Sequence, residues 1–528
     1  MADTTSEAGG SSGPSRSGAG AGPGVLTIEA PESSEGYAVG QLEERGIELI
    51  PESERPMKPS GLFLLWAGAI WNVEFVVYGA LMLYIGLSFW QAVAAILIGN
   101  LMYALLGFAS LSGPETGTTA FMVSRAPFGR NGNRAPSLFN WITQVGFEVE
   151  GIALVVLFVI AMFEHEHGTV DAAGKALIII LAVAVQFIMP FLGHATIQKI
   201  LRYLSFVFVV VFIIMAILVI PHAHLSSIKP IKDSWWIWTT GLVIIVSTGG
   251  LGWTENAADY SRYLPKDTPK IKTFLAAGFG GAIPSILLEL LGVAAFMVSS
   301  SVAVSATDLP ASFTAHASWF FWPFVILALP QLFSINTIDM YSSGVTLQAI
   351  GIPLKRWGCI VIDTIVSGGI TALVIYKGNF LTDLSSFLDY IVVWLGPWFG
   401  IVGVDYLLRR GQYSRLSLAA KSGGIYWRNG GFNWKALFSL GAGMFAAMMW
   451  IDALYYKPSY TGPLSNGTHG MDLSWIFGLL VAAIVYYALS FRSVQREAAE
   501  TRRELSSPHM QRSPVQSPMS PGGDVART

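Results

Sequence analysis

Acidic and amide side chains inside apolar segments are the residues of this sequence whose types and spacing favour chemistry. Asn72 and Glu74 lie in one such segment, and Asn336 and Asp339 lie in another. A carboxylate at the centre of a membrane helix costs about 2.5–3.5 kcal/mol to insert, so each is a functional candidate by default. Burial disfavours the charged form of an acid, which then binds protons readily. The predicted chemistry is the binding of a polar solute and a proton, with no bond made or broken.

Five further acids fall within apolar runs, namely Glu148, Glu150, Glu289, Asp363 and Asp389. The spacing of Glu148 places it on the same side of a helix as Phe147 and Gly151, and Glu150 can face the same cavity. For the last three acids a second interpretation stays open, in which a neighbouring Ser, Thr or Trp caps the carboxyl group.

Two apolar segments carry features that interrupt a helix. The segment around Gly249, Gly250 and Gly252 holds three glycines in four positions, each of which weakens a helix by roughly 1 kcal/mol relative to alanine. Non-helical backbone at membrane depth is tolerated only beside a cavity. This segment and the one with Asn72 are five spans apart, which is the offset expected for two five-helix repeats that each open with a broken helix.

Three flat aromatic side chains, Trp71, Phe147 and Trp253, lie near these polar groups in the sequence. A single Trp in a membrane helix is more often a packing residue or an interface anchor. Three aromatics beside interrupted segments favour a stacking site for a planar, hydrogen-bonding solute.

The composition identifies a membrane protein. The chain has 528 residues, 53% of them apolar and 12% charged, with a mean hydropathy of +0.53. Soluble domains carry about 25% charged residues, so an ordinary cytosolic enzyme is excluded. The net charge of −2 lacks the basic surplus that nucleic-acid binding needs. One cysteine, Cys359, and histidines without zinc-site spacing lead us to expect no metal and no cofactor.

Apolar runs long enough to cross a bilayer recur twelve times and predict an all-α polytopic fold. The expected spans are 62–86, 89–111, 137–163, 174–193, 203–221, 236–256, 274–299, 319–349, 357–376, 381–408, 434–455 and 473–491. With the N-terminus inside, the cytoplasmic loops between helices carry 17 Lys and Arg, whereas the outer loops carry five. The positive-inside rule therefore predicts a multi-pass protein of the plasma membrane with both termini in the cytoplasm.

The same pattern divides the chain into five parts. They are a disordered N-terminal tail (1–58), a first five-helix repeat (59–221), a second repeat (222–410), a cytoplasmic loop with two peripheral helices (411–491), and a disordered C-terminal tail (492–528). The Gly/Ser-rich start and the Ser-Pro pairs of the end are typical of disordered segments.

Several sequence blocks resemble one known family. The run from Gly252 to Pro265 reads GWTENAADYSRYLP and is similar to a stretch of the purine–cytosine permease-like branch of the nucleobase:cation symporter-1 family. Similar blocks follow in the same order over roughly residues 45–490, namely Trp66 to Gly79, Ser112 to Gly117, Ser124 to Gly129, Gly193 to Tyr203, Asn336 to Gly351, Asp405 to Gly411 and Gly431 to Lys435.

The resemblance implies a LeuT-like 5+5 inverted-repeat fold with broken helices 1 and 6, two peripheral helices, and symport of planar heterocycles with a proton or sodium ion. By position, Phe147 falls where relatives often have a stacking Trp, Gly151 or Glu150 where they have an amide, and Asp339 where they often have an Asn, while Gly252 and Trp253 lie in the helix-six substrate segment. Together with the residues singled out above, the candidate substrate contacts are Trp71, Asn72, Glu74, Phe147, Glu148, Glu150, Gly151, Gly252, Trp253, Asn336 and Asp339, and the candidates for ion coupling are Glu74, Ser334 and Asp339. Sodium-coupled relatives show a Ser-Thr pair after Gln-Leu in helix eight. Here Gln331-Leu332 is followed by Phe333-Ser334, so one hydroxyl is missing and proton coupling is favoured.

We therefore expect a secondary transporter that imports a purine or cytosine with protons by alternating access. The alternatives are the same machinery carrying another heterocycle (allantoin, a hydantoin, pyridoxine or thiamine), or a channel or solute sensor. The extra carboxylates keep a cationic substrate such as thiamine open. The segment from Asp259 to Arg262 is open to two interpretations, an inner gate or a plain helix end.

Overall fold

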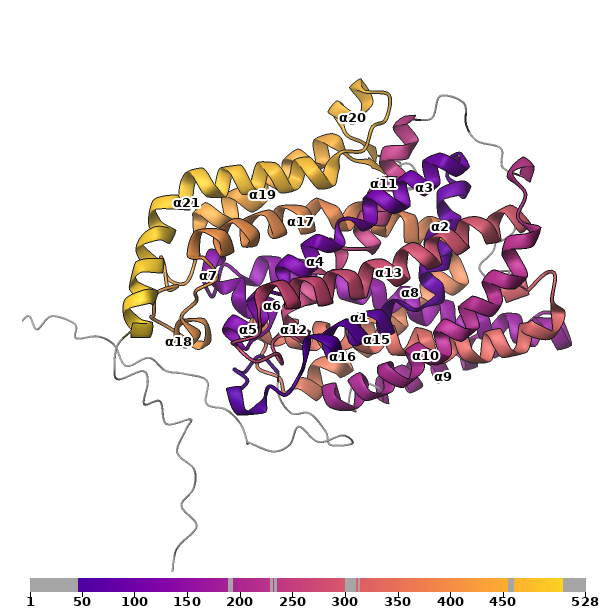
Figure 1. The fold of residues 1–528 in the computed structure, drawn as a ribbon, viewed down its shortest axis with the longest axis horizontal. Coiled ribbons are helices and arrows are strands. Elements are labelled where there is room, and N and C mark those ends of the chain that lie inside the picture. The colour runs from indigo at the N-terminus through magenta and orange to yellow at the C-terminus, as the bar shows by residue number, and fades with distance from the viewer. Residues whose placement is uncertain are drawn as a thin grey trace, which may run out of the picture.

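The computed structural model describes residues 46–188, 193–227, 231, 235–299, 310–311, 314–453 and 460–506, and these residues are almost entirely helical. Long helices run side by side along the long axis of the molecule (Figure 1). The outermost parts of the two predicted disordered tails, residues 1–45 and 507–528, lie outside the described residues.

The first half of the chain forms two broken or segmented spans and three long helices. Its helices are α1 (Pro59–Ile70), α2 (Val73–Tyr84), α3 (Phe89–Asn100), α4 (Tyr103–Ala109), α5 (Ser112–Thr116), α6 (Ala120–Val123), α7 (Arg125–Phe128), α8 (Arg134–His167), α9 (Ala172–Ile188) and α10 (Gly193–Val219).

The second half also consists mainly of long helices, followed near its end by a short β-hairpin and a final helix. Its elements are α11 (Trp235–Thr248), the 3-10 helix η5 (Gly252–Asn256), α12 (Ala257–Ser261), α13 (Lys270–Val298), α15 (Phe321–Ile350), α16 (Arg356–Lys377), α17 (Phe380–Arg409), α18 (Arg415–Ala419), α19 (Trp434–Trp450), β1 (Asp452–Ala453), β2 (Tyr460–Thr461), α20 (Pro463–Gly467) and α21 (Ser474–Ser506). β1 and β2 pair antiparallel. Short 3-10 helices cover Glu52–Glu54, Ile220–His222, Leu225–Ser227 and Ser318–Phe320.

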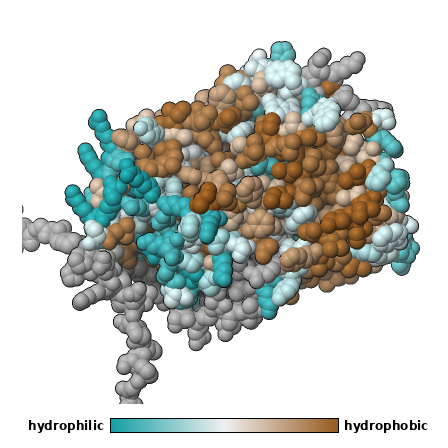
Figure 2. Space-filling view, in the orientation of Figure 1, coloured by the Kyte–Doolittle hydropathy of each residue, from teal (hydrophilic) through white to brown (hydrophobic). Residues whose placement is uncertain are grey.

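An apolar belt surrounds these helices. Figure 2 shows brown, hydrophobic surface over the middle of the visible face, while teal surface gathers at the end that carries α18 and the last turns of α21. Among the described residues, nine helices are long and apolar enough to span a membrane, and α1 with α2 forms a tenth, broken span. α9 and α19 have only 17 residues each, about 26 Å of helix. The predicted count of twelve spans therefore stays a prediction.

Close backbone contact joins α2 to α13 at the centre of the molecule. A Cβ atom on Gly79 would lie 1.8 Å from the carbonyl oxygen of Glu289, and one on Gly292 would lie 1.9 Å from that of Val76. Glycine is required at both positions because any side chain would push the helices apart. Glu289 itself accepts hydrogen bonds from Asn100 Nδ2 at 2.5 Å and from Ser285 Oγ at 3.0 Å. This agrees with the interpretation of Glu289 as a capped acid.

The segment before α1 is packed on the protein, although the sequence predicts disorder for all of 1–58. Ile50 N donates to Gly117 O at 2.9 Å, and Arg55 donates to Ile50 O and Pro114 O. Burial lowers the pKa of Arg55 to about 10. The expectation of disorder is therefore wrong for residues 46–58, because a buried arginine that binds backbone carbonyls holds this segment against α5 and the glycine that follows it.

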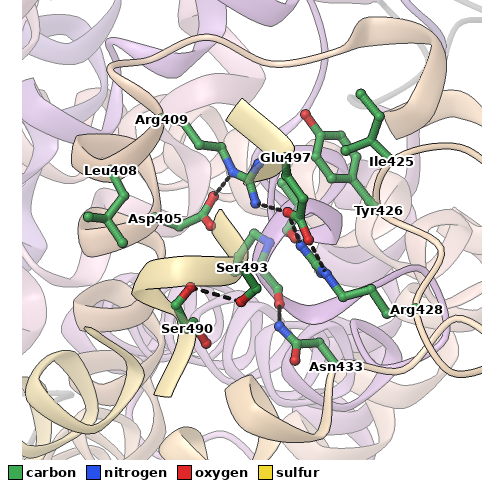
Figure 3. A network of polar contacts seen from close by, with 12 residues as sticks. Asp405, Leu408, Arg409, Ile425, Tyr426, Arg428, Asn433, Ser490, Ser493 and Glu497 are labelled. Carbon is green, nitrogen blue, oxygen red and sulfur yellow. Dashed lines mark hydrogen bonds and ion pairs between the residues drawn. The ribbon is translucent and has the colours of Figure 1, made fainter. Parts of the chain in front are cut away.

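α21 likewise continues to Ser506, so the predicted disorder of 492–528 is wrong for its first part. The reason is a buried ionic network (Figure 3). Glu497 accepts hydrogen bonds from Arg409 at 2.7 Å and from both Nε and Nη2 of Arg428, while Arg409 also binds Asp405 at 2.7 Å. The network ties the charged end of α21 to the end of α17 and to the loop before α19.

Removing the central cation of this network has a large expected cost. Arg409→Ala leaves the fully buried Asp405 without its cation and takes from Glu497 one of its two arginine partners. We expect the free energy of unfolding to fall by about 3–5 kcal/mol, the usual cost of orphaning a buried charge. Thermal unfolding in detergent measures the effect. Arg410→Ala changes the exposed neighbour and serves as control. Equal melting of the two variants would show that the network contributes nothing.

Candidate functional site

The first span breaks where the sequence predicts. α1 and α2 meet at an angle of 57°, and Trp71 and Asn72 form the break. Asn72 Oδ1 accepts a hydrogen bond from Glu74 N at 3.1 Å and so caps α2. Asn72 Nδ2 donates to the carbonyl oxygen of Gln331 on α15 at 3.1 Å. The predicted site residue Asn72 thus holds the broken helix against α15.

The second interruption lies between α11 and α12. The helix stops at Thr248, and the chain continues through a turn into η5. A Cβ on Gly250 would lie 2.0 Å from the carbonyl of Met102, and one on Gly252 would lie 1.9 Å from Ser247 O. Only glycine allows this close backbone approach. Trp253 Nε1 donates to Thr248 O at 3.1 Å and so satisfies a carbonyl near the helix end.

Two of the three predicted aromatics face each other. The rings of Phe147 and Trp253 are parallel within 14°, with centroids 6.3 Å apart. Trp66 meets Trp253 edge to face at 5.6 Å. Trp71 stacks instead on Phe212 of α10, with ring centroids 6.1 Å apart. The structure therefore brings Phe147 and Trp253 together and turns the Trp71 ring toward another helix.

Three of the predicted acids converge from three helices. Glu74 on α2, Glu150 on α8 and Asp339 on α15 are buried and interact electrostatically with one another. Tyr78 OH donates to Glu150 Oε1 at 2.6 Å. Within the part of the chain that the structure describes, Glu150 Oε2 and Asp339 Oδ1 are buried without a hydrogen-bond partner. Buried polar atoms are normally paired, so unpaired acids at helix breaks mark a place for a ligand or a proton.

The neutral predicted residues lie beside these acids. Asn336 Nδ2 donates to Glu148 O at 3.2 Å, whereas Asn336 Oδ1 and both side-chain polar atoms of Gln331 are buried and unpaired. A Cβ on Gly151 would lie 2.1 Å from Asn336 Oδ1, so Gly151 is where α8 and α15 touch. Ser334 Oγ donates to Pro330 O at 2.5 Å and is already engaged within its own helix.

Some polar residues of this region were missed by the sequence reasoning. Glu255 lies in the glycine-rich interruption and interacts electrostatically with Asp339. Gln144 Nε2 donates to Glu255 Oε1 at 2.6 Å and to Asn256 Oδ1 at 2.9 Å. The position of Glu255 beside the glycines was an available signal. Gln144 and Tyr78 had none, because their partners are distant in the sequence.

The segment after η5 contacts several parts of the protein. Asp259 Oδ1 accepts from Ala120 N at 2.9 Å, and Arg262 donates to Gly46 O at 2.9 Å and to Tyr341 OH at 2.6 Å. These bonds hold α12 against α15, the start of α6 and the segment before α1. Among the described residues, no group of three or more His, Cys, Asp or Glu could hold a metal ion.

The structure combines two interrupted helices, a bundle of long apolar helices around them, and unpaired acids between them. This combination is typical of a membrane transporter. The structure has the LeuT-like fold of Mhp1, a nucleobase-cation-symport-1 family transporter solved in a closed conformation with bromovinylhydantoin bound. The TM-score is 0.68 at 19% identity, over 88% of this chain and 96% of that one.

The chain belongs to the family of permeases for cytosine/purines, uracil, thiamine and allantoin, whose sequence profile matches residues 49–478. It is 30% identical to a putative purine-cytosine permease, YxlA, of Bacillus subtilis, over 88% of this chain and 100% of that protein. It is 24% identical to the purine-cytosine permease fcyB of Emericella nidulans, over 85% of this chain and 88% of that one. The resemblance stated from the sequence blocks is confirmed.

Proposed function

We propose that this protein imports a nucleobase, a purine or cytosine, by symport with protons. One observation carries the proposal: the parallel rings of Phe147 and Trp253 lie at the interrupted helix, in a core that also holds unpaired acids. A flat solute with N–H and C=O groups on its edge matches both features. The two relatives named above are purine-cytosine permeases, which supports the same substrate class.

In the proposed binding mode the heterocycle is sandwiched between the two rings. A sandwich needs centroids about 7 Å apart, twice the carbon–carbon contact distance of about 3.5 Å. The centroids of Phe147 and Trp253 are 6.3 Å apart, so the two rings have to separate further to admit a heterocycle between them. The remaining proposed substrate contacts are Trp71, Asn72, Glu74, Glu148, Glu150, Gly151, Gly252, Asn336 and Asp339.

The proposed coupling ion is a proton, held by Glu74 or Asp339. Both acids are buried, and they interact electrostatically with Glu150 rather than with a nearby cation. Acids that crowd together without water are most stable when one of them is protonated. A proton is favoured over sodium because Phe333 precedes Ser334, so the second hydroxyl oxygen of a Ser-Thr pair is missing.

We further propose twelve spans in a 5+5 inverted repeat, with residues 59–221 and 222–410 as the repeats and both termini in the cytoplasm. Occupancy of the site lets one helix bundle rock against the other and opens the cavity inward. The contacts of Asp259 and Arg262 with three other segments favour their role as an inner gate.

A second candidate substrate is a cationic heterocycle of the thiamine kind. The convergence of Glu74, Glu150 and Asp339, with Glu255 nearby, favours it because these acids can neutralise a positive ring. The family description includes thiamine.

Uptake into proteoliposomes tests the proposal. Labelled adenine, hypoxanthine, cytosine and thiamine are offered under an inward pH gradient or an inward sodium gradient. We expect nucleobase uptake driven by the pH gradient alone. Uptake of thiamine only would establish the second candidate, and equal drive by sodium would refute proton coupling.

A further inference from the structure

A second group of polar side chains lies behind the proposed substrate site, where α8, α15 and α16 pack together. Ser343 Oγ on α15 lies 2.8 Å from Glu148 Oε1 and 2.8 Å from Asp363 Oδ2, and 3.2 Å from Met340 O. All three side chains are fully buried. The indole N–H of Trp141 donates to Asp363 Oδ1 and fixes the orientation of that carboxyl group.

The hydrogen count of this cluster requires at least one protonated carboxyl group. A serine hydroxyl carries a single hydrogen, yet Ser343 Oγ lies at bonding distance from two carboxyl oxygens. If both acids were ionised, one of these contacts would press two oxygen atoms together with no hydrogen between them. At least one of the two acids therefore carries a proton. With a single proton, its carboxyl group donates to Ser343 Oγ while the hydroxyl donates to the other carboxylate.

We propose that Glu148, Ser343 and Asp363 form a proton-binding site that holds one proton between two carboxyl groups and passes it through the serine hydroxyl. In the transfer, the O–H bond of one carboxylic acid breaks as a new O–H bond forms on Ser343. The original hydroxyl proton moves to the other carboxylate. The number of protons and the total charge are unchanged, and the two end states differ only in which acid is neutral.

The location of the site links it to the transport centre. Ser343 lies one helical turn after Asp339 on α15, so both side chains project from the same face of that helix. Glu148 interacts electrostatically with Asp339 as well as with Asp363. Among the described residues, Glu148 Oε2 has no partner at full hydrogen-bond geometry, although Ser367 lies close enough to interact with this carboxyl group.

The other titratable groups around the pair are few. Asp339 on α15 and Cys359 on α16 interact with it electrostatically. α9 presents the neutral Gln186, whose Nε2 donates to Met340 Sδ. Asp389 on α17 interacts instead with acids of the outer hairpin region. Among the described residues, no Lys or Arg neutralises the pair through an ion pair, so a proton is the available counter-charge.

The claim that this site holds the coupled proton rests on the proposed function. The claim that the site holds a proton at all does not, and the first test addresses that claim. Infrared spectra of the purified protein at neutral pH are compared with those of the Glu148→Gln/Asp363→Asn double variant. We expect the wild type to show one protonated-carboxyl band that the double variant lacks. If the difference between the two spectra shows the loss of ionised carboxylates only, and of no protonated carboxyl group, the proposal is overturned, whatever the protein transports.

The second test measures coupling. If one proton binds with each substrate molecule, the wild-type Kd rises about tenfold per pH unit on the alkaline side. We expect Asp363→Asn and Ser343→Ala to flatten this dependence and to abolish substrate-driven proton uptake into proteoliposomes. Ser343→Thr keeps the hydroxyl and should retain both. Asp389→Asn, the same change at another buried acid, is the matched control.

The outcomes are distinct. Wild-type pH dependence in both Asp363→Asn and Ser343→Ala would show that the pair does not carry the coupled proton. Nucleobase uptake by the wild type without proton uptake would refute proton coupling in the proposed function, and the infrared result would then decide the proton site on its own.

Discussion

Trp253→Ala is expected to weaken nucleobase binding by about 5- to 150-fold, because stacking contributes about 1–3 kcal/mol per base. Trp253 supplies one wall of the proposed sandwich, and Phe147 supplies the other. Titration of the purified variant with labelled nucleobase measures the dissociation constant. Trp253→Phe keeps a flat ring and should lose much less.

Loss of a large aromatic can also disturb packing, since Trp253 contacts Trp66. The control is Trp450→Ala, which removes an indole that stacks on Phe477 at 4.7 Å in the peripheral helices. It should bind nucleobase like the wild type. Undiminished affinity in a well-folded Trp253→Ala protein would mean that the substrate does not stack on this ring.

Asp339→Asn is expected to abolish concentrative uptake. With one proton per substrate, an inward gradient of one pH unit supports about tenfold accumulation, worth about 1.4 kcal/mol. The amide keeps the shape of the side chain but cannot bind the proton, so the internal concentration should rise only to the external one. Proteoliposome uptake at steady state, with and without the pH gradient, measures the ratio.

The control for this prediction is again Asp389→Asn. Asp389 is buried, and neither of its carboxyl oxygens has a hydrogen-bond partner among the described residues. Asp389 is thus a buried acid like Asp339, but it does not belong to the proposed substrate and proton site. Tenfold accumulation that survives in Asp339→Asn would exclude Asp339 as a coupling acid and leave Glu74 and the Glu148–Asp363 pair as the candidates.

Much of the fold could be predicted from local sequence features. Three glycines within four positions cannot sustain a regular helix in an apolar span, and the chain is interrupted there. Asn72 is a good helix N-cap, and α2 starts directly after it. The ends of the chain were harder to predict. Composition suggests disorder for residues 46–58 and 492–506, but Arg55 and Glu497 bind distant groups that order them.

The candidate site was predicted less completely. Glu74, Glu150 and Asp339 do converge, as do Phe147 and Trp253. Asp363 does contact a Ser and a Trp, as one of its two interpretations from the sequence expected, but these partners, Ser343 and Trp141, come from two other helices. No local pattern indicates such pairs, because their separation along the chain exceeds any helical period.

The sequence by itself determined the class of the protein, the positions of most of its long apolar helices and the two places where the helical backbone is interrupted. These properties follow from segment length, apolar content and backbone preference, all of which act over a few turns. Only the tertiary structure decided the directions in which side chains point. Rotation of each helix about its axis, set by packing such as that of Gly79 against Glu289, turned Trp71 toward Phe212 and placed Ser343 between two acids.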